Sequence, residues 1–112
     1  MNLYLLLKYL KFNDEMNTEI MGLYNSVEEF MQWNNLFIKN NIQVMSEDDL
    51  VKSIDLEKEI DRTRNRLLDS SRKRLTNESN LKAELLYMDI IKHLEHIGDY
   101  SLNISQALEQ IN

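Results

Sequence analysis

The chain lacks cysteine and proline altogether and has only two glycines among its 112 residues. The absence of cysteine excludes disulfide frameworks and thiolate metal sites. Because sheet proteins need glycine and proline in their many turns, the scarcity of both favours long helices. A chain of this length with 43% hydrophobic residues suits one compact domain with a modest core. We therefore expect a single all-α domain over residues 1–112.

Positive charge is also scarce, since 13 basic residues stand against 19 acidic ones and the net charge is −6. A nucleic-acid-binding surface needs concentrated positive potential, so this composition disfavours it. The opening MNLYLLLKYLKF is apolar, but it contains Lys8 and Lys11 and is far shorter than the roughly 20 residues that span a bilayer. We expect it to form the first turns of a packed helix. A juxtamembrane or linker stub at residues 1–12 is the alternative.

Apolar residues after Asn13 recur at alternating spacings of four and three, a pattern typical of a helix that packs along one face. Asn34 and Asn41 fill the two gaps in this series. The pattern predicts a first helix near residues 3–44, with a break expected at Asn13 and Asp14. The core-facing apolar residues of this helix are expected to be Met16, Ile20, Leu23, Val27, Phe30, Phe37 and Val44.

Polar sequences mark the ends of two further helices. The SEDD sequence that begins at Ser46 is typical of a capping box, in which a side chain accepts a hydrogen bond from a free backbone N–H at the helix start. The TNESN sequence at residues 76–80 predicts a turn, because its side chains compete with helical hydrogen bonds. The sequence thus predicts an antiparallel three-helix bundle with helices near 3–44, 47–76 and 79–111.

Four acids interrupt the apolar patterns of the second and third helices. Read at spacings of four and three, the second helix gives the series Leu50, Ile54, Glu57, Asp61, Arg64, Leu68, Ser71 and Leu75. The third helix gives Leu81, Leu85 and Met88, followed on the same face by Glu95 and Asp99. Asp61 and Glu95 each lie about 17 residues from the expected turn. At the α-helical rise of about 1.5 Å per residue, each is about 25 Å from that turn. We therefore expect the two acid pairs to lie at one level, on the core-facing stripes.

Two acids four residues apart on a helix repel one another, and burying either without a partner is costly. Two such pairs on facing helices therefore predict a cation between them, and carboxylate oxygens suit Fe(III), Mg, Mn, Ca or Zn. The competing interpretation is that the acids reach solvent or form ion pairs with Lys58, Arg62 or Arg64. Both interpretations stay open on the pattern alone.

Two histidines and a glycine lie close to the second acid pair. His93 and His96 are separated by three residues and are expected to point off the acid face, at the solvent edge. Gly98 lies between Glu95 and Asp99, where the lack of a Cβ permits close approach. The approaching group is either a metal-bridging ligand or a neighbouring helix at a close crossing.

The segment LEHIGDYSLNI resembles the Leu-Glu-Arg-Ile-Gly-Asp-x-x-x-Asn-Ile segment of PhoU-domain proteins, and LEKEID resembles their earlier acidic helix. The similarity covers roughly residues 47–107. It implies a three-helix bundle in which one acid pair on each of two helices holds a cluster of metal ions, mainly iron or zinc. The residues that match this motif are Glu57, Asp61, Glu95 and Asp99. His96 departs from the usual arginine, which puts any phosphate or partner contact of that residue in doubt.

Full-length PhoU regulators resemble two such units in tandem, so this chain resembles one half. The resemblance implies a regulatory domain of phosphate transport or phosphate signalling that contacts a transporter or sensor protein. It further implies a cytoplasmic location. The chain would be either a separate cytoplasmic protein or the cytosolic domain of an inner-membrane protein similar to sodium/phosphate cotransporters. A lone unit would leave an apolar helix face uncovered, expected on the first helix, so we expect a homo-oligomer.

The sequence offers no nucleophile with a positioned base and no glycine-rich phosphate loop, so we do not expect an enzyme. A metal-dependent hydrolase that uses the carboxylates would be recognised by turnover of phosphate esters. The main alternative to the regulatory domain is a metal-free helical interaction or dimerisation scaffold whose acids form surface ion pairs.

Overall fold

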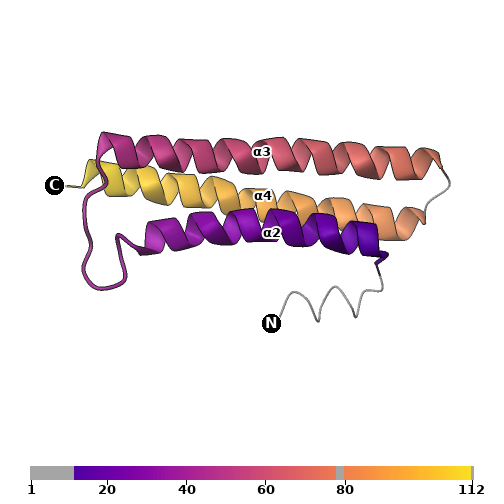
Figure 1. Cartoon of the computed structure of the whole chain (residues 1–112), viewed down its shortest axis with the longest axis horizontal. Helices are drawn as coiled ribbons and strands as arrows, with labels where there is room; N and C mark the ends of the chain where they lie inside the picture. The colour runs from indigo at the N-terminus through magenta and orange to yellow at the C-terminus, as the bar shows by residue number, and fades with distance from the viewer. Residues whose placement is uncertain (1–11, 78–79, 112) are drawn as a thin grey trace.

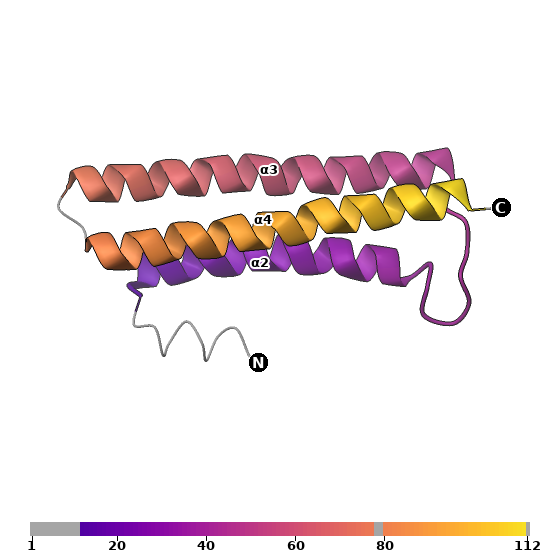
Figure 2. The same ribbon diagram turned by 180° about the vertical axis from the view of Figure 1, so that it is seen from behind.

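The computed structural model describes residues 12–77 and 80–111. These residues form three helices, α2 (Asp14–Asn35), α3 (Glu47–Thr76) and α4 (Leu81–Gln110), and contain no strand. Every helix packs against the other two. Helices α2 and α4 run in the same direction, and α3 runs antiparallel to both, as Figures 1 and 2 show from opposite sides. The expected all-α three-helix bundle is confirmed.

Local capping explains where the helices begin. The Asn13 side chain accepts a hydrogen bond of 2.8 Å from the Met16 N–H, which starts α2 at the expected break. Ser46 and Asp49 each accept a 3.0 Å hydrogen bond from the other's backbone N–H, and they form the expected capping box of α3. The Asn80 side chain caps α4 by accepting a hydrogen bond of 3.1 Å from the Ala83 N–H. The predicted starts of the second and third helices are therefore correct to within two residues.

The predicted end of the first helix is wrong. Helix α2 stops at Asn35, and the chain then crosses to α3 through residues 36–46. Val44, expected in the core, is exposed, and Asn41 is exposed as well. The part of the expected helix at residues 3–11 lies outside the described residues, as does the proposed stub except for Phe12, which is buried in the core.

The crossing segment is stabilised by contacts that a helix would not allow. The Gln43 N–H donates to the Phe37 carbonyl at 2.8 Å and closes a loop around two asparagines, a residue type that competes with helical hydrogen bonds. The Met45 N–H donates to the Leu108 carbonyl at 3.0 Å, and the Met45 side chain is buried. Tertiary contact with the end of α4 thus overrides the four-three pattern.

The core follows the predicted stripe of α2 through its five apolar residues from Met16 to Phe30. Asn34 extends this stripe as a buried polar residue. Its Nδ2 donates to the Ser101 carbonyl at 2.7 Å, and its Oδ1 accepts from the Ser105 hydroxyl at 2.5 Å. These bonds join α2 to α4 near their C-terminal ends.

The predicted stripes of α3 and α4 are wrong by one residue, which is a rotation of about 100°, except that Ser71 is buried as the α3 series predicted. Leu81 and Leu85 are 59% and 51% exposed, whereas the positions one before the predicted Leu85, Met88, Glu95 and Asp99 are buried. Those buried residues are Glu84, Tyr87, Ile91, Leu94, Gly98, Ser101, Ser105 and Leu108. In α3 they are Ser53, Ile60, Thr63, Leu67 and Ser71. The four acids therefore flank the core instead of occupying it.

Gly98 marks a close crossing of α3 and α4. A Cβ at this position would lie 3.2 Å from both Cδ1 and Cγ2 of Ile60, which is itself fully buried. The described structure thus supports the helix-crossing explanation of this glycine. The crossing brings the two helices together next to Glu95 and Asp99.

A buried ionic cluster lies near the α3–α4 turn, and sequence reasoning missed it. We call it the Arg74 cluster. Arg74 forms an ion pair with the fully buried Glu84 and a second, at 2.8 Å, with Glu19. The Tyr87 hydroxyl donates to Glu19 at 2.9 Å, and the Ser71 hydroxyl donates to Glu84 at 2.6 Å. The cluster ties all three helices together at this end.

The opposite end of the α2–α3 interface contains the single tryptophan of the chain. The Trp33 Nε1–H donates to the Ser53 hydroxyl at 2.9 Å, and the Lys52 Nζ lies 4.2 Å from the centre of a Trp33 ring. The rings of Phe37 and Trp33 pack in a T-shaped arrangement at a centroid distance of 5.1 Å. Of the described helices, none is both long and apolar enough to cross a lipid bilayer.

Candidate metal centre

The acids of α3 and α4 meet across the seam between the two helices. One carboxylate oxygen each from Glu57, Asp61 and Asp99 lies within 4.8 Å of the others. Glu57 and Asp61 come from successive turns of α3, and Asp99 comes from α4. The expectation that the pairs lie at one level is thus met by these three side chains.

Glu95, the fourth acid, lies beside this group and is more buried than Asp99, its partner in the α4 acid pair, with a side chain 12% exposed against 44% for Asp99. Its Oε1 accepts a hydrogen bond of 2.6 Å from the Arg64 guanidinium on α3. The same guanidinium lies 3.9 Å from the Asp61 carboxylate. Arg64 therefore links the two acid pairs, whereas Arg62, another partner considered from the sequence, pairs with Glu59 away from the seam.

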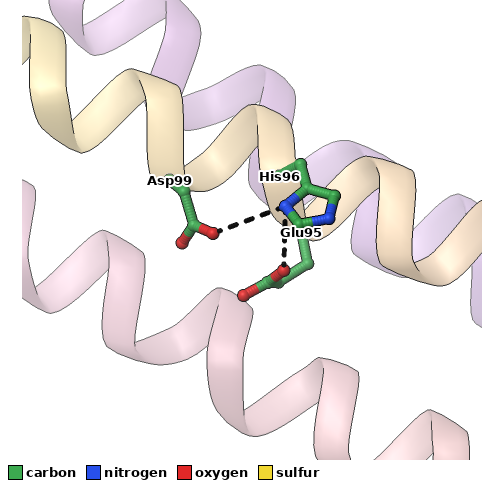
Figure 3. Close-up of side chains that lie close together, drawn as sticks. All are labelled: Glu95, His96 and Asp99. Carbon is green, nitrogen blue, oxygen red and sulfur yellow. Dashed lines mark ion pairs between the residues drawn. The ribbon is translucent and has the colours of Figure 1, made fainter.

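His96 lies over the acids of α4, which corrects the expectation that it points off their face. Its Nδ1 is 3.7 Å from carboxylate oxygens of both Glu95 and Asp99, as Figure 3 shows. The imidazole is nevertheless 61% exposed, so its expected position at the solvent edge is correct. One ligand atom from each of these three residues lies within 4.8 Å of the others, and Asp99 belongs to both groups.

Crowding of the carboxylates changes their affinity for protons. Partial burial raises the pKa of Glu57 to about 7, and its hydrogen bonds and repulsion with Asp61 and Asp99 act in the same direction. Partial burial and the Asp99 charge also raise the pKa of Glu95, while Arg64 lowers it. The local negative charge therefore exceeds what Arg64 balances.

The donor set fits a metal ion. Carboxylate oxygens bind zinc or calcium at about 2.0–2.6 Å, so ligands on opposite sides of one ion are about 4–5 Å apart. The spacing of up to 4.8 Å among Glu57, Asp61 and Asp99 matches this requirement. Such oxygens favour hard or borderline cations, and the imidazole of His96 would suit zinc or iron.

Comparison with protein-family models gave a match to this chain. The PhoU domain model matches residues 36–108, which include all of α3 and nearly all of α4. Neither a comparison with curated proteins nor one with solved structures gave a match. The family match covers more than half of the chain and contains both acid pairs. The chain therefore belongs to the PhoU-domain family.

Proposed function

We propose that this chain is a metal-binding regulatory domain that acts in phosphate transport or phosphate signalling. The regulatory part follows from the family, which is linked to the control of phosphate transport. The metal-binding part rests on one observation, the convergence of Glu57, Asp61 and Asp99 oxygens within 4.8 Å from two helices. Glu95 completes the proposed set of four ligands.

A bound cation would supply the positive charge that the crowded carboxylates lack. Glu57 and Asp61 would hold it from α3, and Glu95 and Asp99 would hold it from α4, so binding would join the two helices at this level. The resemblance favours a multinuclear iron or zinc cluster. The presence of two neighbouring ligand groups that share Asp99 supports more than one ion.

The proposed mode of action is contact with other proteins. No described feature favours catalysis, and the family is regulatory, so the proposed partner is a transporter or sensor protein that packs against the helix surfaces. The proposed location is the cytoplasm, where the chain would be either a separate protein or the cytosolic part of an inner-membrane transporter. The proposal also includes association of the chain with itself.

A metal-free interaction scaffold is the second candidate, and the Arg64 contact favours it. Because this guanidinium already pairs with Glu95 at 2.6 Å, part of the acid charge is balanced without a metal. The two candidates differ in whether the carboxylates take up an ion.

Metal uptake tests the proposal directly. Protein freed of metal with chelator is titrated with Fe²⁺, Fe³⁺, Zn²⁺ and Mg²⁺, and bound metal is measured by elemental analysis and calorimetry. The matched control exchanges the acids of a second i, i+4 pair on α3, Asp55→Asn with Glu59→Gln, since both residues are exposed. We expect wild type and this control to bind metal, and the combination of E57Q, D61N, E95Q and D99N to bind none.

Replacement of the four acids by leucine is a second test that distinguishes the metal-binding domain from the metal-free scaffold. Removal of the crowded charge should raise the melting temperature of metal-free protein by more than loss of the Arg64–Glu95 ion pair lowers it, while metal uptake is lost. Metal should raise the melting temperature of wild type, because it binds the folded state. Wild type that takes up no metal and melts at one temperature with or without EDTA would establish the scaffold instead.

A further inference from the structure

Helix α4 presents an apolar stripe on the flank opposite the acids. We call it the outer stripe, and its residues are Leu86, Ile90, His93, Ile97, Tyr100, Ile104 and Ala107 of the helix, with the C-cap residue Ile111 at its end. Most members of the outer stripe precede a buried residue by one position, whereas Glu95 and Asp99 follow a buried residue by one. The core therefore separates the outer stripe from the candidate metal centre. Tyr100 is 66% exposed, and Ile97 and Ile104 are also exposed.

The spacing of the outer stripe is symmetric. Its members are separated by four, three, four, three, four, three and four residues, a series that reads the same in both directions. An antiparallel copy of α4 therefore matches the stripe along its whole length. The facing pairs are Ile97 with Tyr100, His93 with Ile104, Ile90 with Ala107, and Leu86 with Ile111, each joining one copy to the other.

The charge distribution favours a second copy as the occupant. The chain has a net charge of −6, so most of its surface would repel another copy. The outer stripe contains no acid, no lysine and no arginine. Two copies that meet along it would place their candidate metal centres and the associated acids on the far side of each α4.

The area also suits a dimer of modest affinity. The stripe is about 37 Å long at the helical rise and about 10 Å wide, so each copy can cover several hundred Å² of the other. Met31 adds an exposed apolar side chain on the side of α2 that is turned away from Trp33 and its α3 contact. The total stays below the roughly 800 Å² per partner of a standard interface, which suits a dimer of modest affinity.

We propose that the outer stripe of α4 is the contact surface between two copies of this chain, packed antiparallel about a twofold axis between Ile97 and Tyr100. This deepens the self-association in the proposed function and does not depend on a bound metal. Failure of the dimer would leave metal uptake unchanged, so the two proposals fail separately.

The first experiment measures mass by light scattering and sedimentation across a concentration series of the full chain. The stripe variants are Tyr100→Glu and Ile104→Glu. Leu81→Glu and Leu85→Glu are the matched controls, because they place the same charge on exposed positions of α4 off the stripe. We expect wild type and both controls to dimerise, and the stripe variants to be monomeric with unchanged helical content by circular dichroism.

The second experiment tests the antiparallel pairing with cysteines, of which the chain has none. A disulfide requires the two Cα atoms to lie within about 7 Å. A mixture of Ile97→Cys and Tyr100→Cys proteins should form a mixed covalent dimer faster than either variant forms its own. Preferential self-linking of each variant would overturn the antiparallel arrangement.

Two further results would overturn the proposal as a whole. One is a wild type that stays monomeric at every concentration, as expected if residues 1–11 or a different protein cover the stripe. The other is a dimer that the stripe variants leave intact, because its contact would then lie on another surface.

Discussion

Arg64 on α3 lies 2.6 Å from Glu95 on α4 and joins the two helices at the level of the four acids. The pair is partly buried, with the carboxylate side chain only 12% exposed. An ion pair in such surroundings differs from one at the surface, because removing one partner leaves the other poorly solvated. The contribution of this pair can be measured against an exposed pair on the same helix.

Arg64→Gln should destabilise the metal-free protein by about 1–3 kcal/mol, since Glu95 loses a charged hydrogen-bond donor while it stays partly buried. Arg62→Gln is the matched control, because its pair with Glu59 is exposed and should contribute well under about 1 kcal/mol. Urea denaturation in EDTA measures both free energies of unfolding. Equal losses in the two variants would show that the seam pair is no stronger than a surface pair.

The stability of metal-free protein should depend on Glu57 and on pH. The pKa of Glu57 in the folded state is about 7, against an ordinary value of 4.5. Between these values the folded state binds more protons than the unfolded state, so the free energy of unfolding falls as pH rises, and the loss is complete above pH 7. Glu57→Gln removes this contribution.

The measurement compares urea midpoints of wild type and Glu57→Gln at several pH values between about 4.5 and 8 in EDTA. Wild type should lose more stability than the variant over this interval. Parallel curves would mean that Glu57 keeps an ordinary pKa and is not crowded by Asp61 and Asp99.

The two glycines should respond in opposite ways to alanine. A Cβ at Gly22 meets no atom within 4 Å, so Gly22→Ala should gain about 0.5–1 kcal/mol from helix propensity. Gly98→Ala places its Cβ 3.2 Å from two atoms of Ile60, and the overpacking should outweigh the gain and cost about 1 kcal/mol net.

Ile60→Val identifies the source of the Gly98 effect, because it deletes Cδ1, one of the two close atoms. Gly98→Ala should cost less when combined with Ile60→Val than in wild type, as measured by thermal and urea unfolding. Equal stabilisation by both glycine substitutions would show that the α3–α4 crossing is loose.

Arg74→Met should be among the most destabilising single substitutions in α3, at about 3–5 kcal/mol, because it removes the guanidinium that faces the fully buried Glu84. Arg72→Met is the control, since its pair with Asp69 is exposed and its loss should cost under about 1 kcal/mol. Chemical denaturation measures the free energy of unfolding of both variants. A loss at Arg74 as small as the loss at Arg72 would contradict a structural role for the Arg74 cluster.

Local signals in the sequence predict the helix starts well. Asn13 and Ser46 cap their helices through bonds to residues three positions away, so the information lies within one turn. The end of α2 could not be read in this way. It depends on contacts of residues 36–46 with one another and with Leu108, which is distant in the sequence.

The rotation of α3 and α4 was harder to predict than their length. Ser53, Thr63 and Ser71 occupy buried positions of α3, while Leu81 and Leu85 of α4 are exposed, so a search for apolar residues finds the wrong face. The interpretation that the acids interrupt apolar stripes depended on that rotation and was wrong, whereas their spacing, their distance from the turn and their resemblance to the PhoU motif did not depend on it. Their position beside the core, and the approach of His96, required the three-dimensional structure.

The contact between Trp33 and Ser53 provides an optical signal. Since the chain has a single tryptophan, all indole fluorescence comes from one place, where α2 meets α3. Its emission depends on the hydrogen bond to Ser53 and on the nearby Lys52 ammonium, so separation of these helices changes both wavelength and intensity. Unfolding can therefore be followed in the unlabelled protein by the fluorescence of this one residue.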